Sequence, residues 1–204
     1  MARYLGARSR PTRMTGIDLG HFTKPASAKC KSQNRPGHSD KRRVRSSDYG
    51  VQLEMKQAIK HFYGLLEKQF KNYFHEADRM KGSTADNLIK LLESRLDNTV
   101  FRMGFAVTRR EARQIVSHGH ILVNGKRCNI PARLLKSGDK IEIVEKVRSQ
   151  LRIQTACELS KDQSTVEWIN VDRDAFSGEV VNDVDPSIVA DMFKANLVVE
   201  LYSK

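Results

Sequence analysis

The stretch between residues 95 and 145 changes its hydrophobic period halfway, and this change limits the fold more than any other feature of the sequence. In its first part, Leu96, Val100 and Met103 recur at helical spacing and fall in one narrow apolar stripe. Its second part alternates with a period of two around Asn124–Gly125, the pair best suited to a type I′ hairpin turn. We therefore expect two short helices followed by a small antiparallel sheet.

Signals for helix ends divide the first part into these two helices. Gly104 fits the end of one helix, and Thr108 with Glu111 forms a capping box that opens the next. Gly119 fits the position just after the last turn of this second helix. Its apolar residues share one side, and the opposite side carries Arg109, Arg110, Arg113, Gln114 and Ser117.

The arginine-rich side of the second helix has two interpretations. It is either a solvated face, the usual state of surface charge, or a face that meets a phosphate backbone. We favour the second, because no acidic side chain alternates with the arginines as pairing along the helix would require. For His118, bonding to helix-end carbonyls is an equally good alternative. The residues predicted to bind RNA in this stretch are Arg95, Asn98, Arg102, Arg109, Arg110, Arg113, Gln114, His118, Asn124, Lys126 and Arg127.

The sheet is expected to contain more strands than the hairpin alone. Turn residues at Ser137–Asp139 lead into an alternating segment, and two further apolar segments follow residue 165. Residues 146–160 are expected to form a connection with some helix, anchored by Leu151 and Ile153. The expected strands are His120–Val123, Lys126–Ile130, Lys140–Glu145, Trp168–Val171 and Gly178–Val181.

Helices are predicted on both sides of this region. From Ser47 we expect one long helix, because apolar residues continue at spacings of three and four. Gly82–Thr84 break and cap the next helix, and Asp185–Pro186 open another. Residues 197–202 are apolar enough to dock. The residues expected to face inward are Met55, Ile59, Phe62, Leu66, Phe70, Tyr73, Leu88, Ile89, Leu91, Leu92, Ile188, Val189, Met192 and Phe193.

The net charge of +12 is unevenly distributed. Residues 1–50 carry a net charge of +9 and residues 51–150 carry +8, whereas residues 151–204 carry −5. The first three quarters of the chain are therefore expected to bind a polyanion. Prolines and glycines interrupt residues 1–45, so we expect an extended arm that adopts one shape on RNA, rather than a disordered tail. The basic residues predicted to bind RNA in the arm and the first long helix are Arg3, Arg8, Arg10, Arg13, Lys24, Lys29, Lys31, Arg35, Lys41, Arg42, Arg43, Arg45, Lys56 and Lys60.

A resemblance to the alpha-L RNA-binding domain is carried by the segment RLDNTVFRMGFAVTRREARQIVSHGHILVNGKRCNIPARLLKSGDKIEI. The resemblance extends to Met1–Gly6, Ser47–Leu53 and Val199–Lys204 when the chain is set beside the family of bacterial small-subunit ribosomal protein four. It covers nearly the whole chain in the right order. It implies an α+β fold with the domains 1–45 (extended basic arm), 46–94 plus 186–204 (helical domain) and 95–185 (inserted domain, with the RNA-binding module at about 95–155).

The resemblance also implies a function. Members of this family are structural constituents of the small ribosomal subunit and bind rRNA first, at a multi-helix junction in the 5-prime domain. They contact the fifth small-subunit ribosomal protein and line the path by which mRNA enters, where they influence decoding accuracy. The implied partners are therefore small-subunit rRNA, the fifth small-subunit ribosomal protein and the incoming mRNA. The chain's own messenger RNA is a further candidate, because some members repress their own message.

Cysteine usage predicts neither disulfides nor a metal site. Three cysteines without a repeating pattern fit a reducing cytoplasm, where a ribosomal protein is expected. Many family members hold the arm with zinc on four cysteines, but only Cys30 lies in this region, and His21 and His38 match no zinc spacing. The chain therefore resembles the cysteine-depleted branch, with no cofactor, and buried thiols are expected at Cys128 and Cys157.

Catalytic and membrane signatures are absent from the sequence. It contains no GxxxxGK[ST] loop, GxSxG elbow, HExxH motif or paired CxxC, and no apolar run near the ~18 residues of a membrane helix. An RNA-modifying enzyme and a free RNA chaperone are the alternative classes that carry the same module. The enzyme would need a catalytic domain that the 50 residues before Arg95 cannot supply, and the chaperone would lack the arm and the terminal VELYSK. We therefore expect a non-enzymatic protein with no membrane partner.

Overall fold

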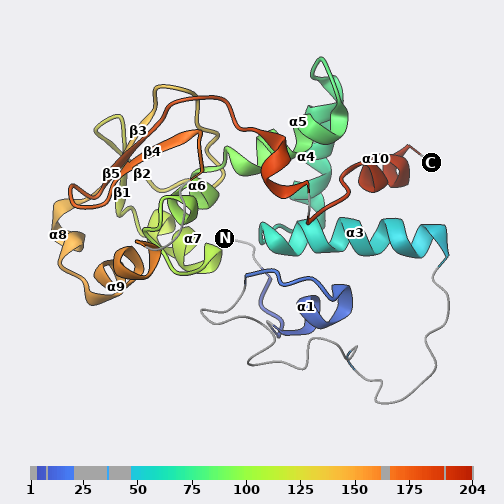
Figure 1. The fold of residues 1–204 in the computed structure, drawn as a ribbon, viewed down its shortest axis with the longest axis horizontal. Helices are drawn as coiled ribbons and strands as arrows, with labels where there is room; N and C mark the ends of the chain where they lie inside the picture. Colours follow the sequence, from blue (N-terminus) through green and yellow to red (C-terminus); the bar gives the residue numbers. More distant parts are fainter. Residues whose placement is uncertain are drawn as a thin grey trace. The chain divides into compact units, whose positions relative to one another are not determined.

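The computed structural model describes residues 4–7, 9–20, 36, 47–161, 166–190 and 192–203. The chain divides into two compact units (Figure 1). Unit 1 consists of Met1–Ile89 and Pro186–Lys204, and unit 2 consists of Lys90–Asp185. None of the helices in the described ranges combines the length and the apolar content that a membrane crossing requires.

Unit 1 is helical in its described residues. Its elements are α1 (Ser9–Thr15), α3 (Asp48–Phe62), α4 (Glu67–Arg79), α5 (Thr84–Glu93, whose last residues belong to unit 2), the 3₁₀ helix η1 (Pro186–Val189) and α10 (Asn196–Tyr202). Helices α1 and α10 both pack on α3 (Figure 1). Aromatic rings join the helices, since Phe62 meets Phe193 edge-on at 5.0 Å between centroids and Phe74 lies 4.5 Å from Tyr202. The C-terminal helix therefore packs on the helical unit, as the resemblance implied.

The single long helix predicted from Ser47 is wrong, because the structure has two. Ser47 caps α3 as expected, with its hydroxyl accepting from the backbone N–H of Gly50 at 3.2 Å. The helix ends at Phe62. Gly64 just beyond it has a φ of +65°, which turns the chain, and α4 begins after Leu66. Apolar residues keep the helical spacing of three and four through this corner, so the hydrophobic pattern did not predict the break between α3 and α4. Ile59, Phe62 and Phe70 from the expected stripe are nonetheless buried.

The N-terminal region also departs from the expectation of a wholly extended arm. Residues Ser9–Thr15 form α1, and Leu19 after it is fully buried in unit 1. Pro11, one of the prolines expected to interrupt the arm, lies in the first turn of this helix, where a missing backbone N–H costs nothing. The remainder of the predicted arm, apart from residues 4–7, 9–20 and 36, lies outside the described residues.

Unit 2 confirms the predicted order of helices followed by an antiparallel sheet. Its helices are α6 (Leu96–Arg102), α7 (Arg109–Ser117), α8 (Glu145–Arg148) and α9 (Leu151–Ser160), and its strands are β1 (Ile121–Val123), β2 (Lys126–Cys128), β3 (Lys140–Ile143), β4 (Ile169–Asp172) and β5 (Ser177–Val180). The strands form one sheet in the order β2-β1-β3-β5-β4, with every neighbouring pair antiparallel. The α+β fold class is therefore confirmed.

Local signals in unit 2 gave the right turns and caps. Asn124 and Gly125 have φ angles of +52° and +75°, and Val123 pairs with Lys126 across them, as a type I′ hairpin requires. The Thr108 hydroxyl accepts from Glu111 N–H at 3.3 Å, and the Glu111 carboxylate accepts from Val107 N–H at 3.0 Å. These bonds fix where α7 begins, and the hairpin fixes the register of the sheet.

Two predicted core residues face solvent instead. Leu151 begins α9 with 77% of its surface exposed, whereas Ile153, two residues on, is fully buried. Met192 is 38% exposed beside buried Val189 and Phe193. Leu151 is the first residue of its helix and has no preceding turn to pack beside, whereas Met192 lies beyond η1, which ends at Val189 and is shorter than the predicted helix.

Candidate nucleic-acid interface

Helix α7 separates its apolar and basic side chains as the sequence predicted. Ala112, Ile115 and Val116 are fully buried on one side. On the other side Arg109, Arg110 and Arg113 are half-buried and Gln114 is exposed. The helix is thus anchored by its apolar side, and three guanidinium groups are held at the surface by the same nine-residue helix.

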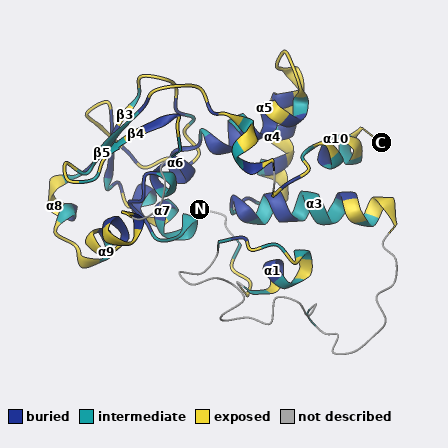
Figure 2. Cartoon of the chain, in the orientation of Figure 1, coloured by how far each residue is buried: buried dark blue, intermediate teal, exposed yellow. Residues whose placement is uncertain are grey.

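Arg95 and Asn98 do not lie on this surface. Their exposed fractions are 1% and 2%, because α6 is buried on nearly all sides and is coloured dark blue over most of its length (Figure 2). The segment Pro131–Leu135 covers the start of α6, where Leu96 and Asp97 donate backbone N–H bonds to the carbonyls of Arg133 and Pro131. Arg95 and Asn98, both predicted to bind RNA, are therefore buried within the unit, and direct RNA contact by them stays a prediction.

The segment before α7 supplies acidic partners for several of the arginines. Asp97 accepts from Arg95 Nε at 3.1 Å and Nη2 at 2.7 Å, and from Arg113 Nη1 at 3.3 Å. Glu93 accepts from Arg102 Nε at 3.0 Å and Nη2 at 2.9 Å. The pattern of charges along α7 alone therefore did not predict these partners, because they come from side chains up to sixteen residues away in sequence.

Asn98 links the two helices of this site. Its amide nitrogen donates to the Glu93 carboxylate at 2.7 Å, and its amide oxygen accepts from Arg109 Nε at 2.9 Å. The Arg109 guanidinium also lies over the Phe101 ring, 4.3 Å from its centroid. Arg102, Arg109, Arg110 and Arg113 are hereafter called the arginine face, and the first two are joined through Glu93 and Asn98.

The hairpin contributes exposed residues next in sequence to this helix pair. Lys126 and Arg127 on β2 are exposed, as is Asn124 in the turn. Asn124 also has an internal role, because its side chain donates to Asp139 at 2.8 Å and accepts from Lys140 N–H at 2.8 Å. Arg127 crosses the end of α7, where a methyl group on Gly119 would come within 3.2 Å of its Cδ.

Several basic side chains lie near one another where α7 ends: His118, His120, Arg127 and Arg152. The rings of His118 and His120 meet edge-on at 5.7 Å between centroids. Burial lowers the pKa of His120, and the charges of Arg152, His118 and Arg127 lower it further. Sequence reasoning assigned no role to His120 or Arg152, because Arg152 comes from α9, far along the chain, and no local pattern connects the two.

Lys56 and Lys60, predicted to bind RNA, both pair with Glu67 within unit 1. Lys60 Nζ lies 3.0 Å from the Glu67 carboxylate, and only 12% and 13% of the two lysine side chains is exposed. The Tyr202 hydroxyl donates to the same carboxylate at 3.1 Å. These contacts join α3, α4 and α10. They give both lysines a role in the fold, and RNA contact by them stays a prediction.

The predicted arm residues are described only in part. Arg10 is exposed and Arg13 half-buried on α1. The positions that lie outside the described residues are Arg3, Arg8, Lys24, Lys29, Lys31, Arg35, Lys41, Arg42, Arg43 and Arg45.

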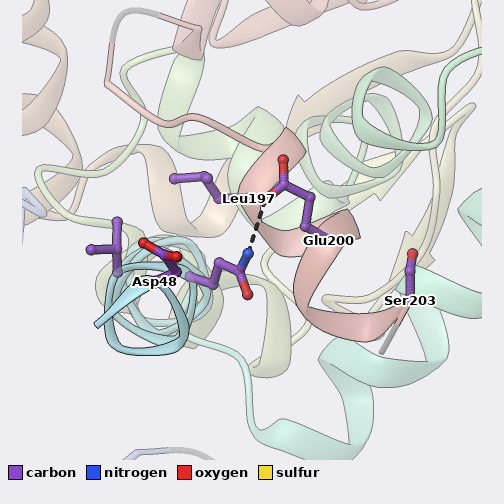
Figure 3. Close-up of a pocket in the computed structure, with 6 residues that line it drawn as sticks. Asp48, Leu197, Glu200 and Ser203 are labelled. Atoms are coloured by element: carbon purple, nitrogen blue, oxygen red, sulfur yellow. Dashed lines mark hydrogen bonds between the residues drawn. The ribbon is translucent and has the colours of Figure 1, made fainter. Parts of the chain in front are cut away.

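The described residues contain no metal cluster of His, Cys, Asp and Glu, and one hollow lies in unit 1. Among them, no three His, Cys, Asp or Glu side chains are grouped as a metal ion would require, and Cys30, His21 and His38 fall outside this part of the chain. A shallow hollow of about 560 Å³ lies between α3 and α10, where Gln52 donates to Glu200 at 2.9 Å (Figure 3). Cys128 and Cys157 are buried thiols, as predicted, and burial raises the pKa of Cys157.

Comparison with known proteins covers the whole chain. Residues 3–93 match the family described as ribosomal protein S4/S9 N-terminal domain, and residues 94–141 match the S4 domain. The chain is 52% identical to small ribosomal subunit protein uS4 of Coxiella burnetii, 50% identical to that of Teredinibacter turnerae and 48% identical to that of Francisella tularensis subsp. novicida. Each alignment covers 100% of this chain and 100% of the relative.

Proposed function

Because the chain belongs to the family of small ribosomal subunit protein uS4, we propose that it binds small-subunit rRNA and holds several of its helices together. Family membership gives the chain a structural role in the small subunit and identifies it as a ribosomal protein rather than an enzyme. The alternatives of an RNA-modifying enzyme or a free chaperone are not retained, since relatives that match from end to end are named as ribosomal proteins.

The observation that carries the RNA-binding proposal is the arginine face. Four arginines from α6 and α7 are held close together by two short helices with buried apolar sides. Arginine suits phosphate because its planar fork donates two parallel hydrogen bonds to one phosphate group. A-form RNA hides its major groove, so recognition by such a face is of phosphates, 2′-hydroxyls and shape.

The finer assignments are proposals that the family resemblance suggests. We place the rRNA contact at a multi-helix junction of the 5-prime domain, with the basic arm and the arginine face gripping different helices. The fifth small-subunit ribosomal protein and the incoming mRNA are proposed partners, through which the chain influences decoding accuracy. The chain's own messenger RNA is a further proposed ligand. The proposed location is the ribosome, and the net charge of +17 over residues 1–150 supports binding to RNA.

Salt dependence of rRNA binding tests the proposal. The full chain is expected to bind a transcript of the 5-prime domain with log affinity falling against log salt at a slope of about 4 to 5 if ~6 phosphates are neutralised. Replacing Arg109, Arg110 and Arg113 by alanine is expected to weaken binding and flatten that slope. A control variant loses the same charge from exposed positions of unit 1, namely Arg79, Lys81 and Lys194.

Two outcomes would decide against the proposal. Absence of wild-type affinity at low salt would remove rRNA binding altogether. Equal weakening of binding in the two triple variants would reduce the arginine face to general positive charge. Circular dichroism and thermal unfolding must show that both variants remain folded, because Arg113 also bonds to buried Asp97.

A further inference from the structure

Two buried carboxylates underlie the arginine face. We propose that Glu93 and Asp97 are positioning residues, which hold Arg102, Arg109 and Arg113 in the orientation that RNA phosphates require. This inference rests on the proposed function, since it presupposes that the arginine face binds RNA. It assigns a role in RNA binding to two acidic residues, which simple electrostatics would class as unfavourable near a polyanion.

Glu93 holds Arg102 by two hydrogen bonds. It is fully buried at the end of α5, and its two oxygens accept from Arg102 Nη2 at 2.9 Å and Nε at 3.0 Å. A two-point bond fixes the plane of the guanidinium as well as its position. The Arg102 side chain is 19% exposed, so it reaches the surface even though Glu93 binds its Nε and Nη2.

Through Asn98, Glu93 also determines the orientation of Arg109. The amide nitrogen of Asn98 donates to the Glu93 side chain at 2.7 Å and to the Glu93 backbone carbonyl at 3.1 Å. With its donor side committed to two acceptors, the amide must point its oxygen toward Arg109, whose Nε donates to it at 2.9 Å. Phe101 supports the same guanidinium from one face at 4.3 Å.

Asp97 binds Arg113, and its charge is also balanced by Arg95. Arg95 is 1% exposed and binds Asp97 at two points, so this pair is complete within the unit. Arg113 adds the longest bond of the group, 3.3 Å from its Nη1 to Asp97 Oδ2. The carboxylate that guides Arg113 is thus already balanced by Arg95, and it directs Arg113 without its full charge opposing a phosphate.

A purely structural role does not explain this arrangement well. Buried ion pairs are costly to desolvate, and well-packed apolar residues usually replace them without loss of stability. Fixed orientation, in contrast, benefits binding, because a long arginine side chain that is already ordered loses less entropy when it meets its ligand. Arg102 and Arg113 bind buried carboxylates directly, and Arg109 is linked to Glu93 through Asn98, an arrangement that matches the second requirement.

Replacing Glu93 with glutamine in the full chain separates positioning from charge. Glu93→Gln keeps the shape of the side chain but leaves one acceptor oxygen for the donors of Arg102 and Asn98. The chain becomes more positive, so general electrostatics predicts tighter binding to the 5-prime-domain transcript. Positioning predicts the opposite sign, a loss of affinity of roughly tenfold. The matched control, Glu158→Gln, removes an exposed carboxylate on α9 and is expected to bind no more weakly than wild type.

A mutant cycle shows whether Glu93 acts through the arginines. In a chain with Arg102→Ala and Arg109→Ala, Glu93→Gln is expected to cause no further loss. The inference is overturned if Glu93→Gln causes an equal loss in that background, or if folded Glu93→Gln binds the transcript as tightly as wild type or more tightly. In either case, binding of the transcript by the wild-type chain leaves the proposed function intact. Failure of the wild-type chain to bind defeats the proposed function itself. If Glu93→Gln does not fold, Glu93→Asp takes its place: it keeps the charge, shortens the reach and is expected to weaken binding, and undiminished binding overturns the inference.

Discussion

Two regions of the molecule use acidic and basic side chains in opposite ways. In unit 2, the carboxylates of Glu93 and Asp97 are 0% and 7% exposed and are met by arginines. In unit 1, Glu67 is 48% exposed and is met by two lysines and the Tyr202 hydroxyl. Both groups join different helices, but the environment of the carboxylate differs.

This difference explains why arginines pair with the carboxylates of unit 2 and lysines pair with Glu67. A buried carboxylate needs every lone pair satisfied, and the planar fork of arginine supplies two parallel donors at once. Lysine offers a compact, strongly hydrated charge, which suits a carboxylate that remains in contact with water. We therefore expect the unit 2 network to affect stability far more per substitution than the Glu67 group does.

Asp97→Ala is expected to have the largest effect. It leaves the guanidinium of Arg95, 1% exposed, without the carboxylate that balances it. Breaking a buried pair in this way lowers the free energy of unfolding by about 3–5 kcal/mol. Urea denaturation followed by far-ultraviolet circular dichroism measures the loss, with exposed Glu145→Ala as the control in the same unit. A loss below about 1 kcal/mol, in the range of a surface pair, would erase the contrast between the two regions.

Sequence reasoning succeeded where a few neighbouring residues determine the structure. The Asn124–Gly125 turn and the Thr108 cap each depend on backbone preferences within four residues, and both were predicted. The sheet also followed, because alternation and turns restrict how short strands can pair. Such signals located α7 and its arginine-bearing side without any knowledge of the tertiary structure.

Sequence reasoning failed where burial depends on a distant segment. Arg95 is buried because residues 131–135 pair with the chain around it, and an isolated bridge joins Arg95 to Leu134. The helical periodicity of residues 95–105 does not predict that residues 131–135 cover Arg95. The corner at Gly64 was missed for a related reason, since the apolar spacing on both sides of it fits one continuous helix.

Asn98→Ala tests the neutral link of the buried network and is expected to have an intermediate effect. The substitution removes donors to Glu93 and the acceptor for Arg109, inside a region where Asn98 is 2% exposed. A buried hydrogen-bonding group left without its partner costs about 1–3 kcal/mol of unfolding free energy. The same urea titration measures it, and a loss as large as that of Asp97→Ala would show that charge is not what distinguishes the network.

Glu67→Gln is expected to have a smaller effect, about 1 kcal/mol or less, because its partners lie at a partly exposed surface. Burial opposes ionisation of Glu67, but hydrogen bonds and charge from Lys56 and Lys60 outweigh it and lower the pKa. A lowered pKa stabilises the fold above the ordinary glutamate value of about 4.3, and this contribution disappears as pH falls through the lowered value. Denaturation at pH 7 and at pH 3 should therefore show the difference between wild type and variant shrinking in acid. A difference that grows in acid would contradict this assignment.

Tyr202→Phe is expected to have the smallest effect at neutral pH, a few tenths of a kcal/mol, since it removes one hydrogen bond to a half-exposed carboxylate. Its influence should emerge in alkali. Burial raises the pKa of Tyr202, and the Glu67 charge and hydrogen bond raise it further. Above the ordinary tyrosine value of about 10, the unfolded chain releases this proton while the folded chain retains it, so wild type loses stability as pH rises. The variant lacks this loss. Between pH 8 and pH 10.5, the thermal unfolding temperature should decrease less for Tyr202→Phe than for wild type. Equal decreases would mean that Tyr202 ionises freely in the folded protein and is not held in a buried contact between α3, α4 and α10.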